Sequence, residues 1–247
     1  MTTVLAILGK GGAGKTVFSA LIARTLLDRG EKPLLLVDAD PTGGLAFAVG
    51  ADTQDTVGAV REKLIKDAAR PDIDRGSVAQ QIDWMILEAL QEHDNFSLLS
   101  MGRTDTKGCF CPLNTILRTA IGKLAEGFRF VILDAEAGIE QVNRQVVKQV
   151  SVPVVVSDGS RRGQQAAGAI AGLLSKYKFG RQRPGLVLNR TEDLVGGVPE
   201  GLDYWGTIPD DQAVRGFDQQ GRSLLELPQD CPALDAVKKI LGDHFFE

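Results

Sequence analysis

The stretch TVLAILGKGGAGKT, residues 3–16, joins a continuous run of apolar residues to a loop rich in glycine and lysine. An apolar run without alternation is typical of a strand buried on both faces of a parallel sheet. The next stretch, TVFSALIARTLLDRG (16–30), carries apolar side chains at helical spacing and stops at Gly30, a residue type that favours the C′ position. The sequence therefore predicts a strand, a glycine-rich loop and a helix in immediate succession.

The same alternation of strand and helix recurs along the chain. Short apolar runs predict five more strands, at residues 33–37, 96–101, 130–133, 152–156 and 185–189. Helical patterns fall at 139–150 and 163–177. The polar segment 51–94 has no strong strand signal and is predicted to form helices inserted between two strands. This order predicts an α/β fold with a doubly wound, mainly parallel sheet and helices on both faces. We expect a single domain over residues 1–247.

Composition argues against several classes of protein. The 247 residues have a formal net charge of −4, and an acidic total is unlike the basic face of most nucleic-acid-binding proteins. No apolar run approaches the ~20 residues that span a bilayer, and the first residues lack the pattern of a signal peptide. Three cysteines predict reduced thiols rather than a disulfide framework. We expect a cytoplasmic protein with no nucleic-acid and no membrane partner.

The segment GKGGAGKT (9–16) matches the P-loop pattern, in which two glycines with four residues between them precede Lys and Ser/Thr. Glycines let the backbone curl so that its N–H groups face phosphates, and the helix N-terminus adds the positive end of its dipole. Lys15 is expected to reach the β- and γ-phosphates, and Thr16 to ligate Mg²⁺. The predicted contacts to ATP or ADP here are Gly9, Lys10, Gly11, Gly12, Ala13, Gly14, Lys15, Thr16 and Val17.

Lys10 follows the first glycine directly, and the loop therefore resembles the deviant Walker A motif of the family that contains MinD, ParA and the nitrogenase iron protein. The resemblance implies a nucleotide-dependent homodimer in which Lys10 reaches the partner's nucleotide. There it would stabilise the transition state, as an arginine finger does. The alternative for Lys10 is a solvated loop lysine.

Three carboxylates follow buried strands in the order that this family shows. LLLVDADP (34–41) contains Asp38 and Asp40, and FVILDAEAG (130–138) contains Asp134. The resemblance implies that these three, with Thr16, hold Mg²⁺ and its water shell, and that Asp40 positions or deprotonates the attacking water. A carboxylate at a strand end can instead cap a helix or form a turn, and this alternative stays open. The expected catalytic residues are Lys10, Lys15 and Asp40.

Two later segments are similar to those that contact the base in this family. GLVLNR (185–190) ends in Asn189, which resembles the asparagine that hydrogen-bonds the adenine amino group, and in Arg190. GTIPDD (206–211), with Pro209 and Asp210, resembles the loop that closes over the base. The resemblance reaches from the first strand to about residue 211, and it implies Mg²⁺-dependent hydrolysis of ATP to ADP and phosphate.

The segment CFCPLNTILR (109–118) places two cysteines just before a predicted helix that begins at Pro112. The positive end of a helix dipole lowers the thiol pKa and favours the thiolate, the form that binds metal. Cys109 and Cys111 supply half of a four-sulfur site, and a homodimer would supply the other half. The alternative is a pair of buried structural cysteines.

This segment, the preceding SMGR and the later LDAEAGIEQVNR resemble the CooC-type ATPases, maturation factors of nickel carbon monoxide dehydrogenase. The resemblance implies a metallochaperone that binds a transition metal, nickel first and zinc second, through Cys109 and Cys111 at the dimer interface. The implied partner is a client nickel enzyme such as carbon monoxide dehydrogenase. Thiolates accept several soft metals, so neither the ion nor the client follows from the residues.

Two other functions stay open. One is a MinD- or ParA-type positioning or partition ATPase that acts on membrane or DNA. The terminal segment PALDAVKKILGDHFFE (232–247) has mixed charges, which favour packing on the sheet over binding to a membrane surface. The other is a redox ATPase with an interfacial iron–sulfur cluster.

Overall fold

The strands of the computed structural model form one sheet in the order β3-β4-β2-β5-β1-β6-β7-β8. The structure describes residues 2–52, 55–68, 84–102, 119, 121–135, 150–176, 183–191 and 197–246. Within them the strands are β1 (Thr3–Gly9), β2 (Leu34–Asp38), β3 (Leu90–Glu92), β4 (Ser97–Ser100), β5 (Phe130–Asp134), β6 (Val152–Ser157), β7 (Gly185–Asn189) and β8 (Asp203–Ile208). Neighbouring strands are parallel except β3 and β4, which are antiparallel.

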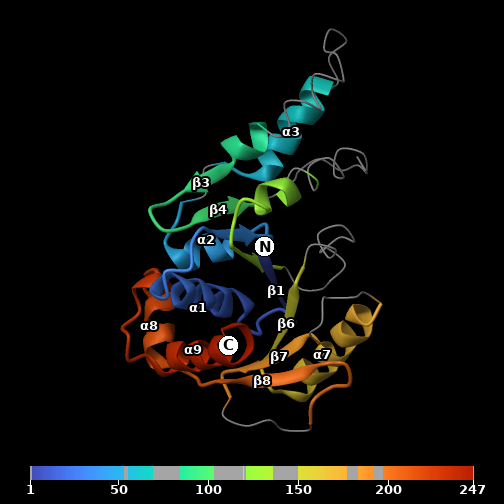
Figure 1. Ribbon diagram of the computed structural model, residues 1–247, viewed down its shortest axis with the longest axis vertical. Coiled ribbons are helices and arrows are strands. Elements are labelled where there is room, and N and C mark those ends of the chain that lie inside the picture. The colour runs from blue at the N-terminus through green and yellow to red at the C-terminus, as the bar shows by residue number, and fades with distance from the viewer. Residues whose placement is uncertain are drawn as a thin grey trace.

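Helices cover both faces of this sheet (Figure 1). One face carries α1 (Lys15–Asp28), α2 (Gly44–Val49) and α9 (Pro232–Phe245), and the other carries α7 (Arg161–Leu174). Further helices are α3 (Val57–Ala68), α8 (Gln212–Gln219) and the 3-10 helix η1 (Leu224–Glu226), and residues 84–88 and 121–125 are helical as well. The doubly wound, mainly parallel α/β fold is therefore confirmed.

The central strands lack alternation because both of their faces are buried. In β2, Leu34 and Leu36 belong to the core on the face of the sheet that α1 covers, whereas Leu35 and Val37 belong to the core on the opposite face. All residues of β2, β5, β6 and β7 are buried. A continuous apolar run is thus the pattern that two covered faces require.

The predicted strands lie within two residues of the observed ones, but the sequence did not predict β3 and β8. The expectation that 51–94 holds no strand is wrong for Leu90–Glu92, an antiparallel edge strand of three residues. β8 is an edge strand of six residues with two exposed residues at its start and an irregularity in its pairing opposite Leu186 and Val187. Neither strand carries the continuous apolar run of the central strands. The helix expected at 139–150 and the start of the helix expected from Pro112 lie outside the described residues. Residues 121–125, in the later part of that second helix, are helical as predicted.

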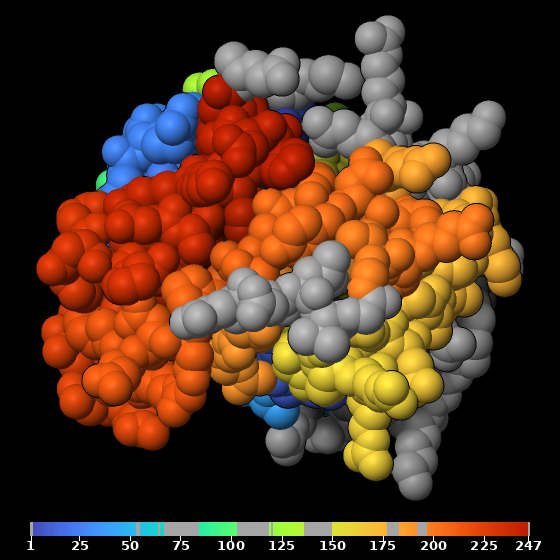
Figure 2. Space-filling view, turned by 90° about the horizontal axis from the view of Figure 1, so that it is seen from below, coloured from blue at the N-terminus to red at the C-terminus, as the bar shows by residue number. Residues whose placement is uncertain are grey.

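The C-terminal helix packs on the sheet, as its mixed charges predict. Helix α9 begins with Pro232 and buries five apolar side chains against α1 and β8: Ala233, Leu234, Val237, Ile240 and Leu241. In the space-filling view the C-terminal residues (red) adjoin β8 (orange) (Figure 2). Over the described ranges, every helix is too short or too polar to cross a bilayer.

Candidate nucleotide site

The loop between β1 and α1 lies at the carboxyl edge of the parallel strands. Gly9 packs against β6 so closely that a Cβ there would lie 2.3 Å from the Val156 carbonyl oxygen. Gly14 has φ 88° and is the N-cap of α1, where it brings no side-chain oxygen to the first N–H groups of the helix. This backbone leaves a helix N-terminus directed at the loop, which is the geometry that binds phosphate.

Thr16 and Asp134 lie together beneath the loop. The Thr16 hydroxyl donates to Asp134 Oδ2 at 2.7 Å, and the Ser19 hydroxyl donates to the other carboxylate oxygen at 3.2 Å. Burial raises the pKa of Asp134 to about 6, although the hydrogen bond from Thr16 opposes the shift. The structure thus brings together two of the residues expected to hold Mg²⁺, and the oxygen ligands fit that ion.

Asp38 lies beside Asp134 in the sheet register and is fully buried. Its carboxylate accepts backbone N–H groups of Leu45 and Ala46 at 2.8 and 3.1 Å, and of Asp40 at 3.1 Å. Burial raises the pKa of Asp38, and these hydrogen bonds oppose the shift. Asp38 therefore caps α2, which is the alternative role of a carboxylate at a strand end. Its contact with the Mg²⁺ shell stays a prediction.

Asp40 lies in the turn between β2 and α2. Its Oδ1 accepts the backbone N–H of Thr42 at 2.8 Å and the Thr42 hydroxyl at 2.6 Å. This local bonding fixes the carboxylate in the turn that follows β2. Its role toward the attacking water stays a prediction.

Lys10 is not a free, solvated lysine. Its Nζ forms an ion pair with Asp158 Oδ2 at 2.7 Å, and its carbonyl oxygen accepts Lys15 Nζ at 3.4 Å. The hydrogen bond from Lys10 lowers the pKa of Asp158 to about 2, and the hydroxyl of Ser160 acts in the same direction. Sequence reasoning missed Asp158. It follows β6 in VSDGS (156–160), and only the pairing of β6 with β1 places it beside the loop.

The residues expected near the base contact the protein itself in this structure. Asn189 Nδ2 donates to the Ala13 carbonyl at 3.0 Å, and Arg190 Nη2 donates to the Gly12 carbonyl at 2.6 Å. Asp210 is bound by Arg215, whose Nε lies 2.8 Å from Oδ1. Pro209 follows β8 directly. The contacts of these residues with adenine stay predictions.

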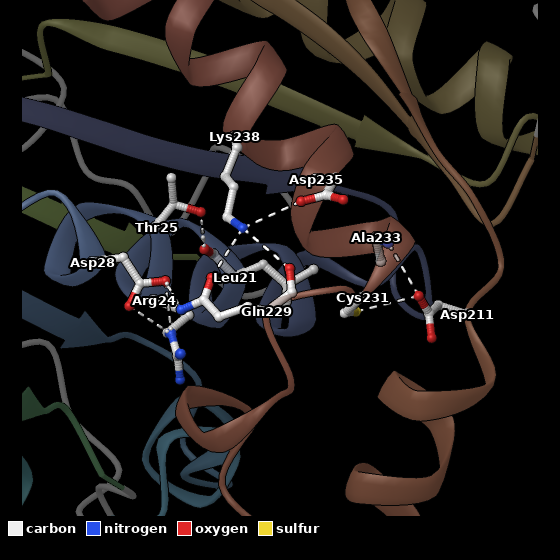
Figure 3. A network of polar contacts seen from close by, with 10 residues as sticks. All are labelled: Leu21, Arg24, Thr25, Asp28, Asp211, Gln229, Cys231, Ala233, Asp235 and Lys238. Atoms are coloured by element: carbon white, nitrogen blue, oxygen red, sulfur yellow. Dashed lines mark hydrogen bonds and ion pairs between the residues drawn. The ribbon is translucent and has the colours of Figure 1, made fainter.

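Cys231 has a structural role. It is buried, and its thiol donates to Asp211 Oδ2 at 3.2 Å (Figure 3). Burial raises the pKa of the Cys231 thiol, which disfavours the thiolate. Cys109 and Cys111 lie outside the described residues. Among the residues that are described, no three His, Cys, Asp or Glu side chains group as a metal site.

Comparisons with known proteins identify the family. A family model described as an AAA domain matches residues 1–173. The chain belongs to this family of ATPases. An uncharacterized ATP-binding protein of Methanocaldococcus jannaschii is 33% identical over 96% of both chains. The carbon monoxide dehydrogenase accessory protein CooC of Rhodospirillum rubrum is 28% identical over 92% of this chain and 91% of that protein.

MinD sequences and solved MinD structures are also similar to this chain. The septum site-determining protein MinD of Thermotoga maritima is 28% identical over 74% of this chain and 61% of that protein. The solved structure of MinD from Pyrococcus horikoshii, in complex with Mg-ADP, has a TM-score of 0.69 at 17% identity and covers 98% of this chain and 96% of that one. At this identity the structural match shows the fold, which is that of MinD and ParA ATPases.

The site can bind ATP and Mg²⁺. The loop backbone and Lys15 would hold the phosphates, while Thr16 and Asp134 would hold the ion. Mg²⁺, when bound, would neutralise charge on the β- and γ-phosphates. The predicted ATPase activity is confirmed by the family.

Proposed function

We propose that this ATPase is a metallochaperone that carries a transition metal on Cys109 and Cys111 and inserts nickel into a client enzyme such as carbon monoxide dehydrogenase. The observation that carries the proposal is the similarity to CooC of Rhodospirillum rubrum over 92% of this chain, together with the Cys-x-Cys segment. The metal is the cargo. Two chains together offer four thiolates, a set that suits soft divalent ions.

The nucleotide site supports a cycle in which two chains associate. Lys10 would leave Asp158 and enter the site of the partner subunit, where its charge would stabilise the transferred phosphoryl group. Asp40 would position the attacking water from the turn after β2. The ion pair that Lys10 must leave is partly exposed, with side-chain exposures of 33% and 24%, so breaking it costs little.

Strand β4 lies next to β2 and precedes the Cys-x-Cys segment in the sequence. The strand before the Cys-x-Cys segment, β4, ends at Ser100, which pairs with Asp38. The next residue, Met101, donates its N–H to the Asp38 carbonyl at 2.8 Å. Met101, eight residues before Cys109 in the sequence, thus lies beside the residue whose carboxylate caps α2. A nucleotide-driven change in this turn would alter how the four thiolates hold metal.

The experiment is to measure bound nickel per chain with ADP and with a nonhydrolysable ATP analogue. We expect one nickel ion per two chains in the native protein and its loss in Cys109→Ser. Cys231→Ser is the matched control, because Ser keeps the hydrogen bond to Asp211 and leaves the Cys-x-Cys segment unchanged. Full nickel affinity in Cys109→Ser, or its loss in Cys231→Ser alone, would contradict the assignment.

A MinD-type positioning ATPase is the second candidate, and the MinD of Thermotoga maritima, at 28% identity, favours it. Helix α9 argues against the membrane form of this function, since its apolar face is already packed on α1 and β8. ATP-dependent co-sedimentation with anionic liposomes, or salt-sensitive retention on DNA, would support the second candidate in place of the first.

A further inference from the structure

Two consecutive residues at the end of β7 bind two consecutive carbonyl groups of the phosphate loop. Asn189 Nδ2 donates to Ala13 at 3.0 Å, and Arg190 Nη2 donates to Gly12 at 2.6 Å. These residues are 176 and 178 positions from their partners in the sequence, so the contacts join the two halves of the fold. In a P-loop the N–H groups face the phosphates, and the carbonyl groups bound here belong to that loop.

Asn189 packs closely against the phosphate loop in addition to its hydrogen bond with the Ala13 carbonyl. The Asn189 side chain is buried, with 5% exposure, and lies directly against Gly14. A Cβ on Gly14 would lie 2.0 Å from Asn189 Nδ2. Glycines give the loop the conformations that it needs but also the largest entropy to lose on ordering. A side chain packed against the loop and bonded to its carbonyl reduces this freedom before any ligand arrives.

Arg190 has an unusual backbone conformation. It has φ 58°, the only positive value of a non-glycine residue among the described residues. A residue with a Cβ in this region is strained by roughly 1 kcal/mol. Such strain is kept where the surrounding structure holds it, often at functional sites. Arg190 follows Asn189 directly, and from this position its guanidinium donates to the Gly12 carbonyl, a charge-assisted hydrogen bond.

We propose that Asn189 and Arg190 are positioning residues, which hold the phosphate loop in its binding conformation by fixing the Ala13 and Gly12 carbonyls. Their contribution is to the affinity for the phosphate chain, whatever base it carries. This inference rests on the ATPase activity and is independent of the metal cargo. It differs from the expected adenine contact of Asn189, which would act on the base alone.

The test separates phosphate from base by using inorganic tripolyphosphate with Mg²⁺ as the probe. Its affinity and that of Mg-ATP are measured by displacement of a fluorescent ATP analogue. The variants are Asn189→Ala and Arg190→Gly, since glycine accepts φ 58° without strain and lacks the guanidinium donor. We expect both variants to weaken tripolyphosphate and ATP by the same factor, about tenfold, the size expected for one lost hydrogen bond of this kind. Arg190→Lys, which keeps a charged donor, is expected to recover part of the loss.

The matched control is Arg183→Gly, because Arg183 is an exposed arginine that precedes the opposite end of β7. It is expected to leave both affinities unchanged. Should Asn189→Ala fold poorly, Arg190→Gly decides the question, since Arg190 is exposed. The proposal is overturned if ATP binding weakens while tripolyphosphate binding is unchanged, the result of a base contact. Affinities equal to those of the control in both variants would overturn it as well.

Discussion

Asp134 is a buried carboxylate, and the Mg²⁺ role proposed for it requires the charged form that burial disfavours. Burial beneath α1 raises its pKa to about 6, and the hydrogen bonds from Thr16 and Ser19 only partly offset this. The folded chain therefore holds a proton on Asp134 between pH 4 and 6 that the unfolded chain has released. The same carboxylate must be ionised to bind Mg²⁺.

The sign of the pH effect follows from this raised pKa. Without Mg²⁺, the folded state binds more protons than the unfolded state, so the free energy of unfolding falls as pH rises from about 4 through 6. Asp134→Asn removes the ionisable group and is expected to stabilise the metal-free protein at pH 7.5, on the order of 1–3 kcal/mol. It should also lower Mg-dependent ATP turnover at least about 100-fold.

Urea unfolding at pH 4.5 and pH 7.5 with chelator measures the first effect. The variant should gain stability at the higher pH and little at the lower one. A gain that is equal at both pH values would contradict the role given to the Asp134 charge.

At the scale of elements, Asp211 joins two helices that are not adjacent in the sequence. Its Oδ1 accepts the N–H groups of Ala213 and Val214 at the start of α8, while Oδ2 accepts those of Ala233 and the Cys231 thiol at the start of α9 (Figure 3). Burial alone would raise the pKa of Asp211, but these hydrogen bonds lower it. One carboxylate thus caps two helices.

Removing this carboxylate should cost the capping energy of both helices. Asp211→Ala is expected to lower the free energy of unfolding by about 1–4 kcal/mol, twice the cost of losing one cap. Cys231→Ser, which keeps a donor to Oδ2, should cost about 1 kcal/mol or less. Urea unfolding of both variants at pH 7.5 checks this. A loss in Asp211→Ala no larger than that in Cys231→Ser would show that the double cap contributes little.

The elements that could be predicted from the sequence are those in which local pattern and burial agree. The uninterrupted runs of β2, β5, β6 and β7 are buried on both faces, and α1 stops near Gly30, whose φ of 72° suits a residue that ends a helix. β8 could not be found in this way, because part of it is exposed and its pairing with β7 is irregular. Local sequence predicts a strand well only where all residues of the strand are buried and its pairing is regular.

At the scale of the whole molecule, strand order decides which residues meet. The sequence places Thr16, Asp38 and Asp134 at strand or loop ends, and the structure brings Thr16 and Asp134 to 2.7 Å. The sequence alone could not predict that β6 brings Asp158 to Lys10 or that β7 brings Asn189 to Ala13, because no local pattern encodes the order of strands. The residues that contact the phosphate loop from other strands could therefore be identified only from the structure.

We propose that a second copy of the chain completes the ATP site, since both the role of Lys10 and the four-thiolate metal site depend on that dimer. The most direct measurement mixes two inactive variants, Lys10→Ala and Asp40→Ala, and follows phosphate release. In a mixed dimer, the site with intact Asp40 receives the intact Lys10 of the other chain, so we predict that mixing restores about a quarter of native activity, set by random pairing with one working site in two. Activity that stays at the level of the separate variants would rule out a site shared between two chains, because it would place Lys10 and Asp40 of the same chain in one site.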